Sequence, residues 1–367
     1  MTRRQAYLVL NQLPRVGPVR VRKLLEYFET PEAILSASEN DIRRVKGFGG
    51  ELAAQVHKWE DHTDLQKEER RIQELGVHYL TTNDELYPEN LREIYDPPLV
   101  LYVWGRLESK DRLALGVVGS RRCTHYGAQS AKKLSYQLAG AGITVLSGLA
   151  RGVDTAAHEG ALAANGRTIA VIGSGLAKLY PPENQSLAEK IADGHGAVIS
   201  EFPIDLPPDK QTFPMRNRIV SGWSSGILVV EAPAWSGSLI TANMAAEQGR
   251  SVYAVPGPID KPTSVGCNKL IQGGARLVMD AQDILDDLGN LFPQQARPAP
   301  TSSATVSLES ISPEERAVYA CVGTSETHVE EILANCDLPT PVVSASLMRM
   351  ELKKLIKQLP GRFYARI

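Results

Sequence analysis

Short, nearly uninterrupted apolar runs dominate the middle of the chain and alternate with stretches of helical periodicity. The runs are rich in Val, Ile and Leu, and they occupy residues 113–118, 143–146, 168–172, 197–199, 227–230, 251–255 and 276–279. Strands that are apolar on both faces are typical of a parallel sheet buried between helices. The pattern therefore predicts an α/β fold with a doubly wound, mainly parallel sheet over residues 76–290.

Residues 1–75 follow the helical period instead and contain a weak internal repeat. Residues 13–19 and 45–50 are glycine-containing turns, and apolar positions at helical spacing follow each of them. Both resemble helix-hairpin-helix units of a SAM-like helical domain, which present backbone N–H groups to a DNA phosphate without reading sequence. Six basic side chains lie between residues 3 and 23, but the second copy is degenerate. DNA contact and a packing or protein-docking role both stay open.

The pattern changes again after residue 290. Residues 291–308 are rich in Pro, Ser, Ala and Gln with little charge, which is typical of a linker. Residues 309–367 predict three helices, the second at 327–336 and the third at 342–359, and a terminal hairpin, an arrangement similar to a winged helix. Basic residues gather on the third helix at Arg349, Lys353, Lys354 and Lys357, although residues 301–367 hold seven basic and eight acidic side chains. DNA contact and protein docking are equally open here.

Composition narrows the class of protein. The 367 residues predict two or three domains, and a formal charge of −2 confines any nucleic-acid site to a local basic patch. Four cysteines are scattered without metal-ligand spacing, which argues against a zinc site and a disulfide framework and favours the reducing cytoplasm. We expect no secretion leader and no membrane span, because no apolar run is long enough.

Glycine, serine and basic residues follow four of the predicted strands. Parallel strands bring their carboxyl ends to one edge of a sheet, where glycine-rich turns and short hydroxyls can approach an oxyanion closely. Four such turns on one edge predict a site for a polyphosphate or a nucleic-acid backbone. The candidate residues are Gly119, Ser120, Arg121, Ser147, Gly148, Arg151, Lys178, Ser236, Gly237 and Ser238.

Residues 213–218 place an aromatic ring before a proline, two arginines and an amide. Pro214 suits the first position of a helix, where its fixed φ is tolerated. Arg216, Asn217 and Arg218 could then hold a phosphate, with Phe213 as a stacking face. The alternative is a surface helix with two solvated arginines and a core phenylalanine.

Other possible chemistry is weaker. The chain lacks the P-loop pattern, and residues 173–178 miss the third glycine of the dinucleotide pattern, so ATP hydrolysis and NAD or FAD binding are not expected. Asp154 and His158 are spaced as a metal or acid/base pair on one helix face, but a capping aspartate and a hydrogen-bonded histidine are the simpler reading. Glu231 could be a catalytic, a capping or an arginine-pairing carboxylate. We expect no catalytic residue, metal or cofactor.

Seven separated motifs resemble the DNA-processing protein A (DprA/Smf) family and occur in its order. They are VGSR at 118–121, SGLARGVDTAAHEGAL at 147–162, YPP with Asn184 at 180–184, SEFP at 200–203, FPMRNR at 213–218, SGSLITA at 236–242 and VPG at 255–257. The resemblance covers residues 75–290 and implies an extended Rossmann-like domain that binds single-stranded DNA. It implies DNA contacts for Arg121, Lys210, Phe213, Arg216 and Arg218.

The same resemblance implies a cytoplasmic, non-catalytic recombination mediator that loads RecA onto single-stranded DNA, as in natural transformation. Single-strand-binding protein is a further expected partner, and we expect a homodimer. The alternative is an enzyme similar to the nucleoside-monophosphate phosphoribohydrolases, or another nucleotide-binding protein on the same fold. The predicted sheet, an arginine and a glycine-rich turn resemble those enzymes. Those enzymes carry a glutamate three residues after the threonine of that turn, and counting from Thr241 this position is Met244. Without that carboxylate, glycosidic cleavage lacks its proton-transfer group.

Overall fold

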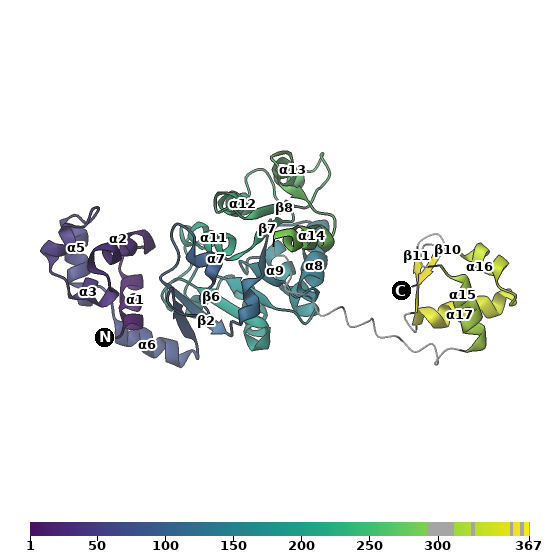
Figure 1. Cartoon of the computed structure of the whole chain (residues 1–367), viewed down its shortest axis with the longest axis horizontal. Helices are drawn as coiled ribbons and strands as arrows, with labels where there is room; N and C mark the ends of the chain where they lie inside the picture. Colours follow the sequence, from purple (N-terminus) through teal and green to yellow (C-terminus); the bar gives the residue numbers. More distant parts are fainter. Residues whose placement is uncertain (292–311, 324–326, 353–354, 360–362, 367) are drawn as a thin grey trace. The chain divides into compact units, whose positions relative to one another are not determined.

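The computed structural model describes residues 1–291, 312–323, 327–352, 355–359 and 363–366. The chain divides into two compact units, Met1–Phe292 and Pro293–Ile367 (Figure 1). The boundary predicted after residue 75 falls inside the first unit, and the linker predicted at 291–308 lies, apart from residue 291, outside the described residues. Both domain boundaries therefore stay predictions.

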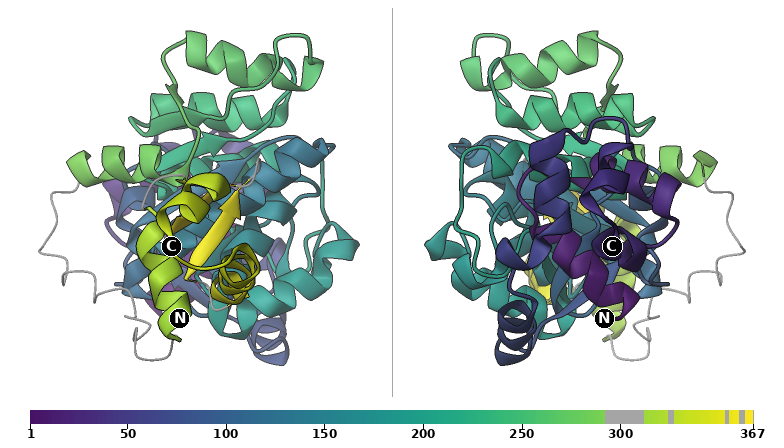
Figure 2. Two further views of the ribbon diagram at one scale, coloured as in Figure 1. Left: turned by 90° about the vertical axis from the view of Figure 1, so that its right-hand side faces the viewer. Right: turned by 90° about the vertical axis from the view of Figure 1, so that its left-hand side faces the viewer.

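A tandem of helical hairpins begins the first unit (purple in the right-hand view of Figure 2). Its helices are α1 (Arg3–Gln12), α2 (Pro18–Phe28), α3 (Pro31–Ser36), α4 (Glu39–Arg43), α5 (Gly50–His57) and α6 (Leu65–Glu74). The two predicted turns precede α2 and α5, which begin after Gly17 and Gly49 without a side-chain cap. Arg15 and Gly47 occupy the same place in the two turns, and both have a positive φ, 63° and 99°. The predicted helix-hairpin-helix repeat is confirmed.

The sheet of the first unit has nine strands. Their bounds are β1 (His78–Thr81), β2 (Val100–Gly105), β3 (Ala114–Val118), β4 (Thr144–Ser147), β5 (Thr168–Val171), β6 (Gly196–Ser200), β7 (Gly226–Val229), β8 (Ser251–Ala254) and β9 (Arg276–Leu277). The spatial order is β1-β2-β6-β5-β4-β3-β7-β8-β9. All pairs from β6 to β9 are parallel, whereas β2 pairs with β1 and β6 antiparallel. The predicted doubly wound sheet is confirmed, and β2 extends it where no strand was expected.

Helices cover both faces of this sheet. One face packs against α8 (His125–Gly140), α9 (Val153–Ala163) and α14 (Ala281–Leu291), and the other against α7 (Glu89–Arg92), α11 (Thr212–Trp223), α12 (Gly237–Glu247) and α13 (Val265–Gln272). In β7, Leu228 faces the first layer while Ile227 and Val229 face the second, which explains its unbroken apolar run. The short α10 (Gln185–Lys190) precedes β6. None of the helices in the described ranges is long and apolar enough to cross a membrane.

Polar contacts join the helical hairpins to the sheet domain. The Glu68 carboxylate on α6 accepts from the backbone N–H of Ile204 at 3.0 Å, and Arg71 on the same helix pairs with Asp205 at 3.0 Å. The amide of Asn11 donates to a carbonyl oxygen just beyond β6 at 2.9 Å. Because Glu68 is only 7% exposed, the contact is part of the packed interior, and residues 1–291 form one body.

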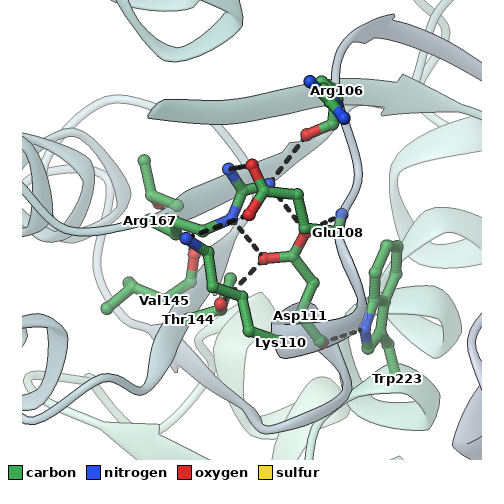
Figure 3. Close-up of polar contacts among 9 residues, drawn as sticks. Arg106, Glu108, Lys110, Asp111, Thr144, Val145, Arg167 and Trp223 are labelled. Carbon is green, nitrogen blue, oxygen red and sulfur yellow. Dashed lines mark hydrogen bonds and ion pairs between the residues drawn. The ribbon is translucent and has the colours of Figure 1, made fainter. Parts of the chain in front are cut away.

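An ion cluster closes the sheet at the amino ends of β4 and β5 (Figure 3). Arg167, which directly precedes β5, donates to Asp111 from Nε and Nη2, each at 2.7 Å, and lies 3.2 Å from Glu108. Asp111 also accepts from Thr144 Oγ1 at the start of β4 at 2.9 Å, and Trp223 Nε1 donates to the Asp111 carbonyl oxygen. The Asp111 and Arg167 side chains are 3% and 10% exposed. Both charges are thus buried and paired with each other.

The second unit is a small winged-helix fold. It contains α15 (Pro313–Cys321), β10 (Thr327–His328), α16 (Val329–Asn335), α17 (Thr340–Leu352), β11 (Ile356–Leu359) and β12 (Phe363–Arg366), with an antiparallel sheet in the order β10-β12-β11. Ser312 begins α15 with a capping box to Glu315, as its sequence predicts. The predicted winged helix is confirmed, but its third helix was predicted too long. Residues 356–359 pair with β12 as a strand, so Lys357 lies on β11, while Lys353 and Lys354 lie outside the described residues.

Candidate nucleic-acid interface

A cleft of about 700 Å³ lies at the carboxyl-end edge of the sheet. After β3 the chain adds β4, β5 and β6 on one side and then returns to add β7 on the other, so β3 and β7 flank the point where the strand order reverses. In open α/β sheets this is where ligands bind. The cleft is lined by Val118, Gly119, Ser120, Arg121, Arg122, Gly148, Ala150, Asp154, Tyr180, Lys210, Phe213, Pro214, Arg216, Asn217, Val220, Pro233, Ser236, Gly237, Ser238, Ile240 and Thr241.

The turn that carries Arg121 is packed tightly against its neighbours. A Cβ added to Gly119 would lie 2.6 Å from Val153 Cγ2, so a larger residue cannot replace this glycine without a shift. Ser120 N donates to the Glu231 carbonyl at 2.7 Å, and the Ser120 hydroxyl accepts from the backbone N–H of Arg122 at 3.1 Å. The turn therefore has a fixed course, and it directs the exposed Arg121 side chain into the cleft.

The carboxylate of Glu231 has a structural role. It is 4% exposed and accepts from the backbone N–H of Thr124 at 3.0 Å and from the Thr124 hydroxyl. Thr124 is the N-cap of α8, so Glu231 holds the start of that helix beside the Arg121 turn. Of the three roles that its sequence left open, the hydrogen bonds support capping.

Cationic and aromatic side chains meet inside the cleft. The Arg121 guanidinium lies 5.2 Å from the centre of the Phe213 ring, and the centre of the Tyr180 ring lies 5.7 Å from that of Phe213, with the two rings tilted by 49°. Phe213 is half-buried and packs over Gly173, whose added Cβ would lie 2.9 Å from the ring. Within the described ranges no carboxylate lies within 4.0 Å of a side-chain nitrogen of Arg121 or Lys210. Their charges are available to an anion.

Helix α11 begins earlier than its proline suggested. It starts at Thr212, whose hydroxyl hydrogen-bonds to the carbonyls of Gly173 and Asp209, and Pro214 is therefore its third residue instead of its first. The prediction was wrong by two positions. The proline is tolerated there because N–H groups of the first helical turn have no carbonyl partner within the helix.

The two arginines of α11 point in different directions, because residues two apart on a helix do not share a face. Arg216 lines the floor of the cleft, is 5% exposed and donates from Nη1 to the Val171 carbonyl at 2.7 Å. Burial lowers the pKa of Arg216 to about 10, and the Asp154 carboxylate opposes that shift. Arg218 is 7% exposed and pairs with Glu201 and, at 3.0 Å, with Asp96. It does not line the cleft.

Asp154 and His158 support the turn below the cleft. The Asp154 carboxylate accepts from the backbone N–H groups of Gly148 at 3.0 Å and Ala150 at 3.3 Å. His158 is fully buried, and its Nδ1 lies 2.7 Å from Thr168 Oγ1. Because the Thr168 hydroxyl donates its proton to Val145, His158 Nδ1 carries the hydrogen. No cluster of three metal-ligating side chains occurs in the described part of the chain. The predicted hydrogen-bonded histidine is confirmed, whereas the predicted capping role of Asp154 is wrong, because Gly152 is the N-cap of α9 and Asp154 bonds the preceding turn instead.

The cleft brings together most of the predicted site residues. Eleven of the fifteen line it: Gly119, Ser120, Arg121, Gly148, Lys210, Phe213, Arg216, Asn217, Ser236, Gly237 and Ser238. The other four lie elsewhere. Ser147 is buried and donates to a carbonyl of β3, Arg151 pairs with Glu183 on the surface, and Lys178 and Arg218 do not line the cleft. A role in DNA binding stays a prediction for every one of them.

Sequence reasoning missed Tyr180 as a candidate. It follows the third predicted strand and belongs to one of the seven motifs. The residue is 37% exposed and lines the cleft, with its ring near that of Phe213. Arg122 and Ile240 also line the cleft without having been predicted. An aromatic residue that follows a glycine-rich turn on the same edge is the signal that would have found Tyr180.

Family models match all three parts of this architecture. Residues 78–289 match the DNA recombination-mediator protein A model, residues 294–362 the DprA winged helix domain, and residues 7–58 the SAM-like helix-hairpin-helix tandem. Protein Smf of Synechocystis is 35% identical over 99% of this chain and 98% of its own length. DNA processing protein DprA of Streptococcus pneumoniae is 40% identical over 72% of this chain and 92% of its own length.

Solved structures agree. DNA processing protein A from Streptococcus pneumoniae matches 78% of this chain and 98% of its own, with 37% identity and a TM-score of 0.69. DNA processing protein A from Helicobacter pylori, whose structure is described in terms of its single-stranded DNA binding mode, matches 59% and 97%, with 30% identity and a TM-score of 0.52. The class is thus a protein in which a helix-hairpin-helix tandem is followed along the chain by a doubly wound sheet and then by a winged helix. The chain belongs to the DNA-processing protein A (DprA/Smf) family.

Proposed function

We propose that the cleft binds single-stranded DNA and that the protein is a non-catalytic recombination mediator. The observation that carries this proposal is the Arg121 guanidinium lying 5.2 Å from the Phe213 ring centre in an open cleft of about 700 Å³. A cation without a carboxylate partner attracts a phosphate, and an aromatic face beside it can stack on an unpaired base of any sequence. Single-stranded DNA offers both groups at once, whereas the bases of a duplex are already stacked.

The proposal includes no catalysis. Asp154 carries the one carboxylate among the residues that line the cleft, and both Asp154 and the neighbouring Glu231 accept hydrogen bonds from backbone N–H groups, which supports a structural role for each. The phosphoribohydrolase-like alternative needs a carboxylate at position 244, and a methionine stands there. Release of ribose phosphate from a panel of nucleoside monophosphates would support that alternative and overturn the non-catalytic reading.

We extend the proposal to loading of RecA onto the bound strand, as in natural transformation. It is supported by the recombination-mediator model that residues 78–289 match. In this reading the protein is a cytoplasmic homodimer, and it acts on DNA that single-strand-binding protein has coated. The test is RecA polymerisation on such coated DNA, with and without the protein. Loading predicts a shorter lag, and an unchanged lag with intact DNA binding would restrict the function to binding alone.

The binding site is tested by salt dependence. Fluorescence anisotropy with a labelled single strand should give a linear fall of log affinity with log salt, and each phosphate contact contributes about 0.7 to the slope. Arg121→Ala should weaken binding on every sequence and flatten the slope by about that amount. Arg70→Ala, an exposed arginine on α6 away from the cleft, is the control and should change neither. Tighter binding of duplex than of single strand would contradict the proposal.

A further inference from the structure

Trp235 is almost wholly exposed, at 98%, in the loop between β7 and α12. The other tryptophans of the chain are half-buried or, like Trp223, buried. An indole has a large apolar surface with a single polar atom, so a fully exposed tryptophan indicates a contact that the isolated chain does not make. Within the described ranges its ring has no aromatic partner and no cation above it.

The loop that carries Trp235 is held in place. The backbone N–H of Ser236 donates to Pro233 at 3.1 Å, and that of Gly266 on α13 donates to Ala232 at 2.8 Å. Ser236 also caps α12 through its hydroxyl. Pro233 and Ser236, on either side of Trp235 in the sequence, both line the cleft. The indole is therefore presented at the rim of the cleft by a closed turn.

Trp235 and Phe213 lie beside the ends of different strands of the sheet. Phe213 packs over Gly173, which follows β5, whereas Trp235 follows β7. The order β5-β4-β3-β7 puts three strand spacings between these two places, or about 14 Å at the usual distance between strands. Arg121 follows β3, which lies between β5 and β7 in the sheet, and its guanidinium reaches to 5.2 Å from the Phe213 ring centre. At about 3.4 Å per stacked nucleotide, the separation corresponds to about four nucleotides.

We propose that Trp235 is a second base-stacking platform, so that one DNA strand crosses the sheet edge from Phe213 to Trp235 with its backbone at Arg121. This inference rests on the proposed function of the same cleft. An aromatic face with a cation beside it, and a second aromatic face farther along the same edge, match the alternation of bases and phosphates along a single strand. The Ser236 and Ser238 hydroxyls, which line the cleft and lie 2.7 Å from each other, add polar partners for the DNA backbone.

The surroundings favour a nucleic acid over a second copy of the chain. Interfaces between copies have apolar, charge-depleted centres. Trp235 instead adjoins a cleft that contains Arg121, Arg122, Lys210 and serine hydroxyls. The other almost fully exposed apolar residue of this edge, Ile259, belongs to a different loop, after β8.

The experiment compares full-length variants on a homothymidine length series. Trp235→Ala should weaken binding about 5- to 100-fold on strands long enough to reach both platforms, with the salt slope unchanged, because stacking releases no counterions. The loss should vanish on strands shorter than about four nucleotides, where Phe213→Ala and Arg121→Ala still weaken binding. Trp235→Tyr should restore most of the affinity. Tyr136→Ala is the matched control and should have no effect. Tyr136 is an aromatic residue that is 51% exposed in the last turns of α8 and does not line the cleft.

The outcomes separate this inference from the proposed function. If the parent protein does not bind single strands, the proposed function fails. If Arg121→Ala and Phe213→Ala weaken binding while Trp235→Ala does not, the second platform alone is wrong. A change in the sedimentation of Trp235→Ala without DNA, together with unaltered DNA affinity, would overturn the inference in favour of an interface between copies. Quenching of exposed-tryptophan fluorescence by long strands, absent in Trp235→Phe, would support it directly.

Discussion

The two edges of the sheet use the same kinds of side chain to opposite ends. At the amino-end edge, Arg167 is buried, and its charge is neutralised by ion pairs with Asp111 and Glu108 of the same chain (Figure 3). At the carboxyl-end edge, Arg121 lies over an aromatic ring with no carboxylate partner among the described residues. The difference is not in the arginine but in what surrounds it. An arginine beside a strand end indicates an anion site only when no carboxylate of the same chain reaches it.

Removing the buried cation should have the largest effect on stability. Arg167→Ala leaves the Asp111 carboxylate buried without its partner, and we expect a loss of about 3–5 kcal/mol in the free energy of unfolding by urea. The DNA affinity of the folded fraction should stay unchanged, since the cluster is at the other edge. Arg151→Ala is the control, because its pair with Glu183 is 55% and 48% exposed and should contribute at most about 1 kcal/mol. Equal losses in the two variants would remove the distinction between the edges.

Truncating the aromatic face should weaken binding instead of folding. Phe213→Ala should reduce single-strand affinity by about 1–3 kcal/mol, or about 5- to 100-fold, with a small change in melting temperature because the ring is only half-buried. Phe213→Trp should bind nearly as well as the parent. The effect should be smaller on duplex. A large fall in melting temperature with the affinity of the folded protein intact would assign Phe213 to the core.

Acid should destabilise the protein through His158, which lies below the cleft. Burial and, to a smaller extent, the Arg216 charge lower the pKa of His158 from 6.5 to about 3. Between these two pH values the imidazole is neutral in the folded protein and protonated in the unfolded chain. The stabilising difference is present above pH 6.5 and is lost as the pH falls toward 3. Between pH 7 and 5 this single group accounts for about 2 kcal/mol.

His158→Gln should remove that part of the pH dependence. The comparison is made by urea unfolding of both proteins at several pH values, so that titration of carboxylates cancels. Parallel stability curves for the parent and the variant would show that His158 takes up its proton in the folded state and is not sealed from water.

The smallest expected effect distinguishes two exposed lysines. Lys210→Ala should lower the salt slope of single-strand binding by about 0.7, since Lys210 lines the cleft. Lys178→Ala should leave the slope unchanged, because Lys178 is exposed but does not line it. If the two variants lose affinity equally, the strand runs beyond the cleft toward the β5 end, and the region of free cations is wider than the cleft itself.

The fold was more accessible to prediction than the site. A strand that is buried on both faces requires a run of apolar residues, and seven strands could be predicted from such runs. Strand β2 was not predicted. It follows a proline-rich passage, and its antiparallel pairing with β6 involves residues about a hundred positions away, which no local sequence pattern reveals. Residues 356–359 continue the apolar pattern of α17 and were therefore predicted as helix. They form strand β11 instead, because they pair with β12.

The parts of the site that are set by the backbone could be predicted from the sequence. The parts that depend on which side chains pair with each other in the fold could not. The glycine-rich turns meet at one edge because parallel strands must bring them there, and most predicted residues line the cleft. Arg218 could not be distinguished from Arg121 by sequence, because its carboxylate partners Asp96 and Glu201 come from other elements. The helical spacing of Arg216 and Arg218 did carry the information that both could not face one ligand.

The contact between Gly148 and Arg216 couples two positions in the sequence. A Cβ at residue 148 would lie 1.7 Å from Nη1 of Arg216, and the guanidinium occupies the space that the missing side chain leaves. Position 148 therefore cannot gain a side chain while the Arg216 guanidinium keeps this place. A shorter side chain at 216 must appear before any residue larger than glycine is tolerated at 148, which fixes the order of substitutions along any evolutionary path. In homologous chains a residue larger than glycine at position 148 should occur only where position 216 is shorter than arginine, and a designer who wishes to reshape this part of the cleft must begin at position 216.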